Sequence, residues 1–418
     1  MKSIIVTGNT TQEIAEAVKK IAKLVKGAKI SAVIPEGIDV IEDGVFADCS
    51  GLTSVVIPAS VTTISSWAFA RCSGLTSISI PKNVTTIGGN AFRGCSGLTY
   101  VVWSAINCTT AGSFIFPIFE GCDKLRTVMF SDNVETIPEA AFAVCTGLTS
   151  ITIPNSVKSI GELAFAYCSE LHLVTIGNGV ESIGYSAFEG CKLKYKTYEN
   201  GLYIGNGRNP YHALIEAKDK SITSFKIHPN TKVIYNDAFH DCTALTSIAI
   251  PNGVTRIGAQ AFKWCSGLSS ITIPASVREI GNGAFALCRE LASISVPTGV
   301  TKVGKSMFYG CSKLTSVTIP NSVTEIGDDA FDGCEKLTSV VLPDSITRIG
   351  DDAFRSCFGM RVVVVPKSVK YIGADAFNMC HRARVEYLGT KDEWDAIGKG
   401  SYWTRPKCIV NCSDGEIE

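Results

Sequence analysis

Apolar and polar residues along this chain repeat with a period of 23 positions. In the unit that runs from Leu75 to Cys95, Ile78 and Ile80 alternate with serines, and Pro81 follows directly. Such alternation over a short run indicates a strand with one buried face, and proline cannot continue the hydrogen bonding of a central strand. Each unit is therefore predicted to contribute one short strand.

The second half of the unit predicts a bend and a short helical turn. Val84 and Ile87 are spaced to point inward again, and the glycine that follows permits a tight bend. Phe92 and Cys95 are three residues apart, which places them on the same side of a helical turn. Because one unit cannot bury this apolar face alone, we expect the units to stack as coils, with parallel strands about 4.8 Å apart.

The most regular feature of the unit is a phenylalanine three residues before a cysteine. Fourteen copies carry it: Phe46/Cys49, Phe69/Cys72, Phe92/Cys95, Phe119/Cys122, Phe142/Cys145, Phe165/Cys168, Phe188/Cys191, Phe239/Cys242, Phe262/Cys265, Phe285/Cys288, Phe308/Cys311, Phe331/Cys334, Phe354/Cys357 and Phe377/Cys380. The resulting pattern, LTSIxIPxxVTxIGxxAFxxC, resembles the BspA-like, or Treponema pallidum-type, leucine-rich repeat family over roughly residues 34–388.

The resemblance implies an α/β repeat fold. We expect a leucine-rich-repeat solenoid of about 15 coils with a 23-residue period, a parallel β-sheet on one face, short helical turns on the other and a cap at each end. It also implies protein-binding or adhesin-like surface proteins, found in host-associated bacteria, some of their phages and some parasitic protists. The family offers no catalytic residues to transfer to this chain.

Both ends depart from the repeat, as a solenoid requires, because an uncovered terminal coil would expose its core and its strand edge. Residues 1–33 are predicted to form an N-terminal cap, since Thr10 and Glu13 fit the capping box of a helix. The apolar side of this amphipathic helix is lined by Ile14, Val18, Ile21 and Val25. Attachment to a partner or to an upstream segment is the alternative.

Residues 389–418 resemble the short closing module that often follows such repeats in gut-bacterial relatives, and they are interpreted as a C-terminal cap. Trp394 and Trp403 belong to this segment, as does the CxxxC of Cys408 and Cys412. The sequence leaves open whether these two cysteines are bridged. Four ligands are not available here, so no zinc site is expected.

The repeat breaks in two places. Between Cys95 and Cys122 the spacing is 27, and the extra residues fall in the apolar stretch 114–118, which predicts either a bulged coil packed on its neighbour or an exposed hydrophobic contact site. Between Cys191 and Cys242 the spacing is 51, and turn signals within the insert at about residues 194–221 predict a projecting hairpin.

The candidate ligand contacts lie in this insert and on the outward strand positions. Loops on a rigid scaffold often carry function, and the insert supplies residue types favoured at interfaces, namely Tyr198, Tyr203, Arg208 and Tyr211. An irregular coil that only caps a seam explains the same residues. The outward strand positions form columns of small hydroxyls, which include Ser247, Ser270, Thr272, Ser293 and Ser316. Solubility and β-propensity are the alternative explanation for these columns.

The sequence supports neither a nucleic-acid partner nor membrane insertion. Its 39 basic residues balance 39 acidic ones, so the electrostatic footprint of a nucleic-acid binder is missing. No apolar run approaches the eighteen or so residues of a membrane span. The segment from Met1 to Gly8 is too short for the apolar region of a signal peptide, so export by that route is not expected unless a longer precursor is trimmed.

Motifs for chemistry are equally sparse. The five histidines show no partner spacing, and no GxSxG, HExxH or Walker sequence occurs, so no catalytic, cofactor or metal residues are predicted. The fourteen repeated cysteines should form an interior ladder of reduced thiols, because equivalent side chains on stacked coils point the same way. Asp328–Asp329 and Asp351–Asp352 are interpreted as solvated positions, with a calcium-holding acidic patch as the alternative.

These observations favour a non-catalytic recognition or adhesion protein. The expected partner is an extended protein or glycan on a host or neighbouring cell, bound from a bacterial or phage surface. The alternative is a structural spacer or assembly component without a ligand of its own, for which self-assembly stays open. The resemblance indicates a cell-surface or secreted protein, whereas the plain N-terminus and the thiol ladder fit a cytoplasmic or virion-associated one.

Overall fold

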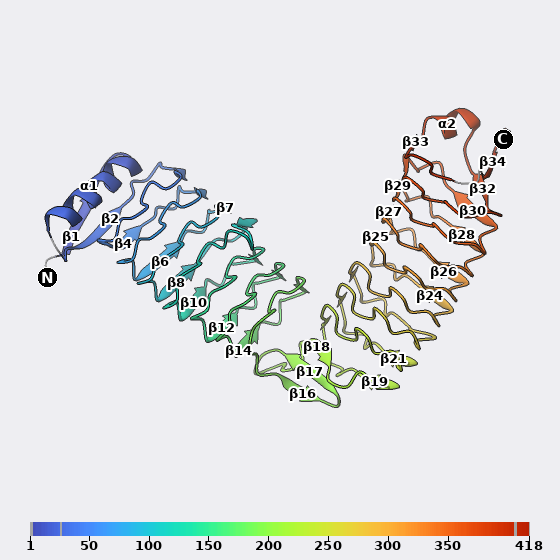
Figure 1. Ribbon diagram of the computed structural model, residues 1–418, viewed down its shortest axis with the longest axis horizontal. Coiled ribbons are helices and arrows are strands. Elements are labelled where there is room, and N and C mark those ends of the chain that lie inside the picture. The colour runs from blue at the N-terminus through green and yellow to red at the C-terminus, as the bar shows by residue number, and fades with distance from the viewer. Residues whose placement is uncertain (1–2, 26, 405–407, 418) are drawn as a thin grey trace. The chain divides into compact units, whose positions relative to one another are not determined.

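The computed structural model describes residues 3–25, 27–404 and 408–417, and its chain divides into two compact units. The first unit comprises Met1–Tyr195 with Ile204–Pro210, and the second comprises Lys196–Tyr203 with Tyr211–Glu418. Within each unit the chain winds as a series of stacked coils (Figure 1). Met1 and Lys2 of the predicted N-terminal cap, and residues 405–407 and 418 of the predicted C-terminal cap, lie outside the described residues.

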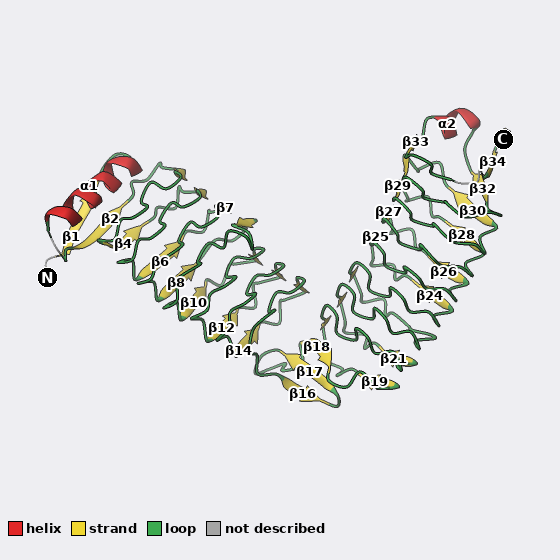
Figure 2. Cartoon of the chain, viewed as in Figure 1, coloured by secondary structure: helices red, strands yellow, loops and turns green. Residues whose placement is uncertain are grey.

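Each regular coil contributes one longer strand and one two-residue strand (Figure 2). In the first unit the longer strands are β1 (Ser3–Thr7), β2 (Lys29–Val33), β4 (Leu52–Val56), β6 (Ser77–Ile80), β8 (Tyr100–Trp103), β10 (Thr127–Phe130), β12 (Ser150–Ile153) and β14 (Leu173–Ile176). The short ones are β3 (Val40–Ile41), β5 (Thr63–Ile64), β7 (Thr86–Ile87), β9 (Thr110–Ala111), β11 (Thr136–Ile137), β13 (Ser159–Ile160) and β15 (Ser182–Ile183).

The second unit repeats this arrangement after an irregular start. It opens with β16 (Lys196–Tyr198), β17 (Gly201–Ile204) and β18 (Ala213–Ala217). The longer strands that follow are β19 (Ser224–Lys226), β21 (Ser247–Ala249), β24 (Ser293–Ser295), β26 (Ser316–Thr318), β28 (Ser339–Val341), β30 (Val362–Val365), β32 (Arg384–Tyr387) and β34 (Ile409–Cys412). The remaining strands are β20 (Val233–Ile234), β22 (Arg256–Ile257), β23 (Glu279–Ile280), β25 (Lys302–Val303), β27 (Glu325–Ile326), β29 (Arg348–Ile349), β31 (Tyr371–Ile372), β33 (Gly398–Lys399) and β35 (Gly415–Ile417).

The coils pair in parallel and in register, as the repeat predicts. Ser77 pairs with Tyr100 one coil later, and Ser293 pairs with Ser316, 23 residues further along the chain. The fold is thus the expected solenoid, but it has about 18 turns where about 15 were expected. The difference arises because terminal strands such as β1 and β34 each complete a turn without the Phe–Cys signature.

The edge that carries the Phe–Cys signature is built from consecutive turns and not from the single helical turn expected. In the coil of Phe262, the amides of Lys263 and Cys265 donate to carbonyls three residues back, at 3.0 and 3.1 Å. The alternate amides of Phe262 and Trp264 donate instead to Ala284 and Ala286 of the next coil, at 2.8 and 2.9 Å. This alternation requires positive φ, as at Trp264 with φ 63°, and it makes the edge a second coil-to-coil ladder.

Phenylalanine rings form a continuous stack inside each unit. Successive rings in the first unit lie 5.0 to 5.7 Å apart, centroid to centroid, and those in the second lie 5.0 to 5.8 Å apart. Nearly all of them are fully buried. Each ring therefore finds its packing partner only in the neighbouring coils, which makes the core a property of the stack and not of any single unit.

The repeated cysteines hydrogen-bond along the same axis. Cys288 Sγ donates to the carbonyl oxygen of Phe262 in the preceding coil at 3.1 Å, and ten other ladder cysteines make the equivalent bond at 3.1 to 3.3 Å. Burial raises the pKa of Cys49 to about 11 and that of Cys311 to about 12. Cys311 is thus held protonated, and protonation is what lets its thiol donate to the Phe285 carbonyl.

Hydroxyl side chains form further ladders at the strand ends. Thr76 donates to the carbonyl of Thr53 at 3.3 Å, and Thr99 donates to that of Thr76 at 3.1 Å. Thr324 and Thr347 make the same kind of bond at the second corner of their coils, at 3.3 and 3.2 Å. Many of the threonines in the repeat are therefore fixed by coil stacking.

The helix α1 (Thr11–Leu24) covers the N-terminal end of the first unit, where it lies beside β1 and β2 (Figure 1). Thr10 caps it by accepting a hydrogen bond from the Glu13 amide at 3.2 Å, as predicted, but the Glu13 carboxylate accepts from Asn9 and not from Thr10. Of the predicted apolar side, Ile14 and Val18 are buried, Ile21 is half-buried and Val25 is exposed. Only the first three turns of the helix therefore cover the end of the core.

The second unit ends in an aromatic cluster. Trp403 packs edge-on against Phe377, the last ring of the stack, with centroids 6.2 Å apart, and against Trp394 at 5.5 Å. Trp394 lies on the helix α2 (Lys391–Asp395), which begins with a complete capping box between Thr390 and Glu393. These contacts cover the final coil.

The raised thiol pKa values predict alkaline destabilisation. An unfolded thiol ionises near pH 9, whereas Cys311 in the fold ionises near 12, so its contribution to stability is fully present below pH 9 and is lost as the pH rises toward 12. For Cys311 alone we expect a loss of about 2 kcal/mol at pH 10.5. Urea unfolding followed by circular dichroism at pH 7.5 and 10.5 measures it. The variant Cys311→Ala should lose less stability between these two pH values than the parent, and an equal loss would contradict the ladder.

Candidate functional site

The candidate strand face lies on the second unit. Ser247 on β21 pairs in register with Ser224 on β19. Ala249, also on β21, forms a β-bridge with Thr272, and Ser293 pairs with Ser316. The side chains of Ser247, Ser270, Thr272, Ser293 and Ser316 are all exposed. The structure therefore brings these five predicted residues together, on four consecutive coils and one face.

The hydroxyls of this region fall into two classes. Thr246, Ser269 and Thr315 donate to carbonyls of the preceding coil at 3.0, 3.4 and 3.0 Å. Their immediate neighbours Ser247, Ser270 and Ser316 donate to no protein group within the described ranges, and the same holds for Thr272 and Ser293. The structural hydroxyls are thus the ones next to the candidate column, and the candidate hydroxyls are left for solvent or a ligand.

The same face is free of charge over a long stretch. The outward positions of β21, β24, β26, β28 and β30 and of the intervening coil at 270–272 carry only Ser, Thr, Ala and Val. Charged side chains flank it at Lys226 and Arg384. Beyond the hydroxyls the face becomes apolar, and Val341 is 66 % exposed there. A smooth polar strip therefore runs into an apolar one.

The insert contains the predicted antiparallel hairpin, formed by β16 and β17. Tyr203 on β17 is fully buried, and its hydroxyl accepts a hydrogen bond from the His228 amide at 3.2 Å. Burial also raises the pKa of Tyr203 to about 12. The expectation that Tyr203 contacts a partner is corrected accordingly, because its position in the strand pattern turns the ring into the core.

Tyr198 and Tyr211 pack around the same histidine. The Tyr211 ring stacks on His228 with centroids 3.9 Å apart, and the Tyr198 ring meets His228 edge-on at 4.8 Å. Both tyrosines are half-buried, and desolvation lowers the pKa of His228. The hairpin therefore packs on its own unit, and these two rings keep a partly exposed edge.

Arg208 belongs to the first unit and is exposed there. Its turn is held by Asn206, whose side-chain amide donates to the Ile176 carbonyl at 2.6 Å. The Asn206 side-chain oxygen accepts from the amides of Arg208 and Asn209, both at 2.9 Å. Arg208 thus lies on a fixed loop of the first unit, whereas the three tyrosines belong to the second unit.

The apolar bulge in the first unit divides into two parts. Ile118 is fully buried and packs as a bulged coil would, whereas Phe114, Ile115 and Phe116 are exposed, Ile115 by 78 %. Phe114 also meets Tyr167, two coils on, with centroids 5.6 Å apart. The prediction of a bulged coil thus describes Ile118, and the prediction of an exposed apolar stretch describes Phe114, Ile115 and Phe116.

The acidic pairs have a structural task. Asp328 accepts a hydrogen bond from the Asp351 amide at 3.0 Å, and Asp351 accepts one from the Ala374 amide at 2.8 Å. Among the described residues no group of three or more His, Cys, Asp or Glu side chains is placed to hold a metal ion. Asp328 and Asp351 thus bind coil to coil, which accounts for the recurrence of the first aspartate of each pair. Cys408 and Cys412 are both free thiols.

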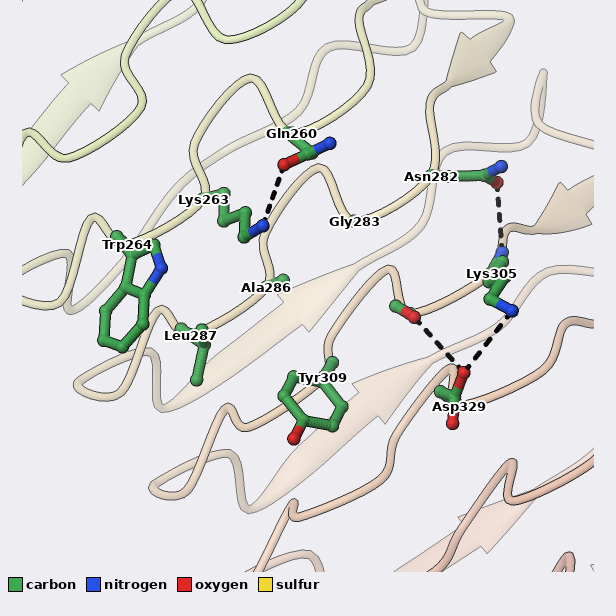
Figure 3. Close-up of a pocket in the computed structure, with 11 residues that line it drawn as sticks. Gln260, Lys263, Trp264, Asn282, Gly283, Ala286, Leu287, Lys305, Tyr309 and Asp329 are labelled. Atoms are coloured by element: carbon green, nitrogen blue, oxygen red, sulfur yellow. Dashed lines mark hydrogen bonds and ion pairs between the residues drawn. The ribbon is translucent and has the colours of Figure 1, made fainter.

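A groove on the Phe–Cys edge of the second unit was not predicted from the sequence. It has a volume of about 500 Å³ and lies between Trp264 and Tyr309, over Gly283 and Ala286 (Figure 3). The signal for it is present in the repeat alignment, where small residues at 283 and 286 follow Gln260 and Lys263 of the preceding coil.

The bonds of Asn206 predict that Asn206→Ala frees the turn around Arg208. Losing four hydrogen bonds from one side chain should speed trypsin cleavage after Arg208 about tenfold or more, because about 1 kcal/mol per bond favours the closed turn. Limited proteolysis read by mass spectrometry checks this. Asn252→Ala, at an exposed turn of the second unit, serves as the control, and unchanged cleavage in Asn206→Ala would show that Asn206 does not hold the turn.

Several solved leucine-rich repeat proteins are similar to this chain. A solved leucine-rich repeat protein from Bacteroides ovatus shares 26 % identity over 91 % of this chain and 83 % of its own, with a TM-score of 0.36. A leucine-rich cell surface protein from Faecalibacterium prausnitzii shares 29 % identity over 88 % and 90 %, with a TM-score of 0.32. A T. pallidum leucine-rich repeat protein shares 24 % over 50 % and 86 %, with a TM-score of 0.34.

No curated protein matches the chain. Within the described ranges, neither helix has the length and apolar content needed to cross a membrane. The model of the BspA type leucine rich repeat region matches residues 27–117, 117–207, 217–338 and 301–402, which together span most of the sequence. The chain belongs to the BspA-type leucine-rich repeat family.

Proposed function

We propose that this chain is a non-catalytic recognition or adhesion protein whose hydroxyl strand face binds an extended protein segment, displayed on a bacterial or phage surface. The observation that carries the proposal is the separation of hydroxyls, since Thr246, Ser269 and Thr315 serve the fold while Ser247, Ser270 and Ser316 stay free. The exposed serines are therefore not used in coil stacking, and their hydroxyls are available to a partner.

The geometry of the face suits an extended partner. One free serine recurs per coil, so hydrogen-bonding groups repeat about every 4.8 Å along the stack. Each such bond contributes little net free energy, about 1 kcal/mol, so useful affinity requires contact with several coils at once. The apolar continuation at Val341 adds a hydrophobic contact at one end of the strip.

Other candidate contacts support the same function from separate places. Tyr198 and Tyr211 offer partly exposed ring edges in the second unit, and tyrosine contributes large contact area at low entropic cost. Arg208 offers an exposed cation on its fixed turn in the first unit. These residues are additional contacts, and the hydroxyl face is the principal one.

Adding charge to the face tests the proposal. Ser270→Lys with Ser293→Lys places two cations in the centre of the uncharged strip, and we expect at least tenfold weaker binding of the partner, because lysine side chains would have to be desolvated against it. The measurement is surface plasmon resonance of the full chain against a panel of purified extracellular-matrix proteins, with a polysaccharide panel in parallel.

The matched control is Ala275→Lys with Asn321→Lys, which adds the same charge at exposed turns off the strand face. Thermal unfolding should be unchanged in both double variants. Equal affinity of the two double variants would contradict the proposed face. Binding to polysaccharides alone would replace a protein partner by a glycan, and no binding together with ordered self-association would favour a structural spacer.

A further inference from the structure

We propose that the groove between Trp264 and Tyr309 is a binding site for a neutral oligosaccharide, separate from the strand face. It lies on the Phe–Cys edge of the second unit, across the coils of Phe262, Phe285 and Phe308. The proposal does not depend on the function proposed above, because the hydroxyl columns point from the strands and the groove lies on the turns.

The groove exists because the middle coil is small where its neighbours are large. Gly283 occupies the position of Gln260 and Ser306, and Ala286 occupies that of Lys263 and Tyr309, in the preceding and following coils. Both small residues are buried at the floor, and the larger side chains stand on either side (Figure 3). The hollow therefore arises from particular residues and is not a general property of stacked coils.

Two aromatic rings form the walls. Tyr309 is 40 % exposed, and Trp264 is partly exposed. One face of the Trp264 ring is taken by the Arg289 guanidinium, whose carbon lies 5.2 Å from the ring centroid. An exposed aromatic ring attracts the polarised C–H groups of a sugar face, and it does so without a compensating loss of hydrogen bonds.

Trp264 occupies a backbone position that does not favour it. Its φ of 63° lies in the left-handed region, as does the φ of 62° at Leu287 one coil later. Gly310 and Gly333 fill the same position in the next two coils, with φ of 66° and 73°. A non-glycine residue is strained there, and Trp264 keeps part of its ring exposed in spite of that strain. The exposed part of the ring can contact a ligand, which glycine at this position could not do.

The rim supplies hydrogen-bond donors. Lys263 Nζ donates to the Gln260 side-chain oxygen at 2.8 Å, which leaves the Gln260 side-chain amide facing the groove edge. Asn282 accepts from the Lys305 amide at 3.1 Å and likewise keeps its own NH₂ group available. Donors placed around apolar walls match a ring whose faces carry C–H groups and whose edge carries hydroxyl oxygens that accept hydrogen bonds.

The charges on the rim favour a neutral ligand. Lys305 Nζ lies 3.9 Å from the Asp329 carboxylate, which also accepts from the Ser306 hydroxyl at 3.5 Å. A strongly anionic ligand would have to approach Asp329, and a cationic one would have to approach Lys263 and Lys305. A neutral sugar meets neither penalty.

The backbone around the groove disfavours an extended peptide. The amide of Trp264 donates to Ala286, that of Leu287 donates to Tyr309 at 2.6 Å, and that of Gln260 donates to Asn282 at 2.9 Å. Strand addition needs free amides and carbonyls along an edge, and here they are used between coils. Recognition must therefore come from side chains, as it does for a saccharide.

The groove continues beyond Tyr309. A second hollow of about 570 Å³ shares Leu287 and Tyr309 with the first and is lined by Arg289, Asp332 and Arg355. Tyr309 thus stands between two adjoining hollows. A ligand of several sugar units therefore fits the surface better than a monosaccharide.

The test is calorimetric titration of the full chain with cellotetraose, maltotetraose, xylotetraose and chitotetraose, followed also by tryptophan fluorescence. We expect saturable binding of at least one of them, weakened about tenfold or more in Trp264→Gly, because the variant removes one of the two aromatic walls of the groove. Glycine occupies this backbone position two and three coils later, at Gly310 and Gly333, so the variant should remain folded.

Trp67→Gly is the matched control, because Trp67 is also exposed and also has positive φ, at 60°, but lies in the first unit. Ala286→Lys fills the groove floor with the residue that the preceding coil carries at that position, and it should abolish binding. The Ser270→Lys and Ser293→Lys variant should bind the saccharide normally. Absence of binding by all four probes up to about 10 mM, or equal affinity in Trp264→Gly and Trp67→Gly, would overturn the proposal.

Discussion

The structure depends on one constraint, which is that no coil can bury its own phenylalanine. Each ring is covered by the rings of its two neighbours, 5.0 to 5.8 Å away in the second unit, and the adjacent cysteine donates to the phenylalanine carbonyl of the coil before it. Positive φ at two positions of the edge turns alternate amides toward the next coil and closes a second ladder there. Stability in such an array is a sum over neighbouring coils, so terminal coils need separate covers. Helix α1 covers one end of the first unit, and Trp394 and Trp403 cover one end of the second.

This constraint also explains how much of the fold was predictable. Phe92 and Cys95 recur with fixed spacing because both point into the stack, and a strict period of that kind is visible in sequence. The conformation of the edge was not visible, since the three-residue spacing of Phe and Cys fits a helical turn as well as two successive turns. Positive φ at Trp264 or Leu287 could not be inferred from residue type, because these side chains are rare in that region.

The candidate site was predicted unevenly for related reasons. Ser247, Ser270 and Ser316 were placed on the outward face because strand alternation determines direction. The burial of Tyr203 was not predicted, because the insert interrupts the 23-residue period. The direction of the Tyr203 side chain then depends on the hairpin register, in which Tyr203 pairs with Lys196. The groove at Trp264 escaped notice because it arises from a comparison of three coils, in which only the middle one is small. Local irregularities within a strict repeat are therefore where the sequence is hardest to interpret and where binding sites are most worth seeking.

The stack of phenylalanine rings is the source of order for both surfaces, and native-state amide hydrogen exchange of Phe285→Ala tests this most directly. The substitution removes one ring between Phe262 and Phe308. If stability is carried by neighbouring coils, protection should fall most at the amides of the coils that contain residues 262–265, 285–288 and 308–311, and it should persist in the distant coil of residues 354–357. Loss of protection that is equal throughout the second unit, or no loss at all, would contradict the account.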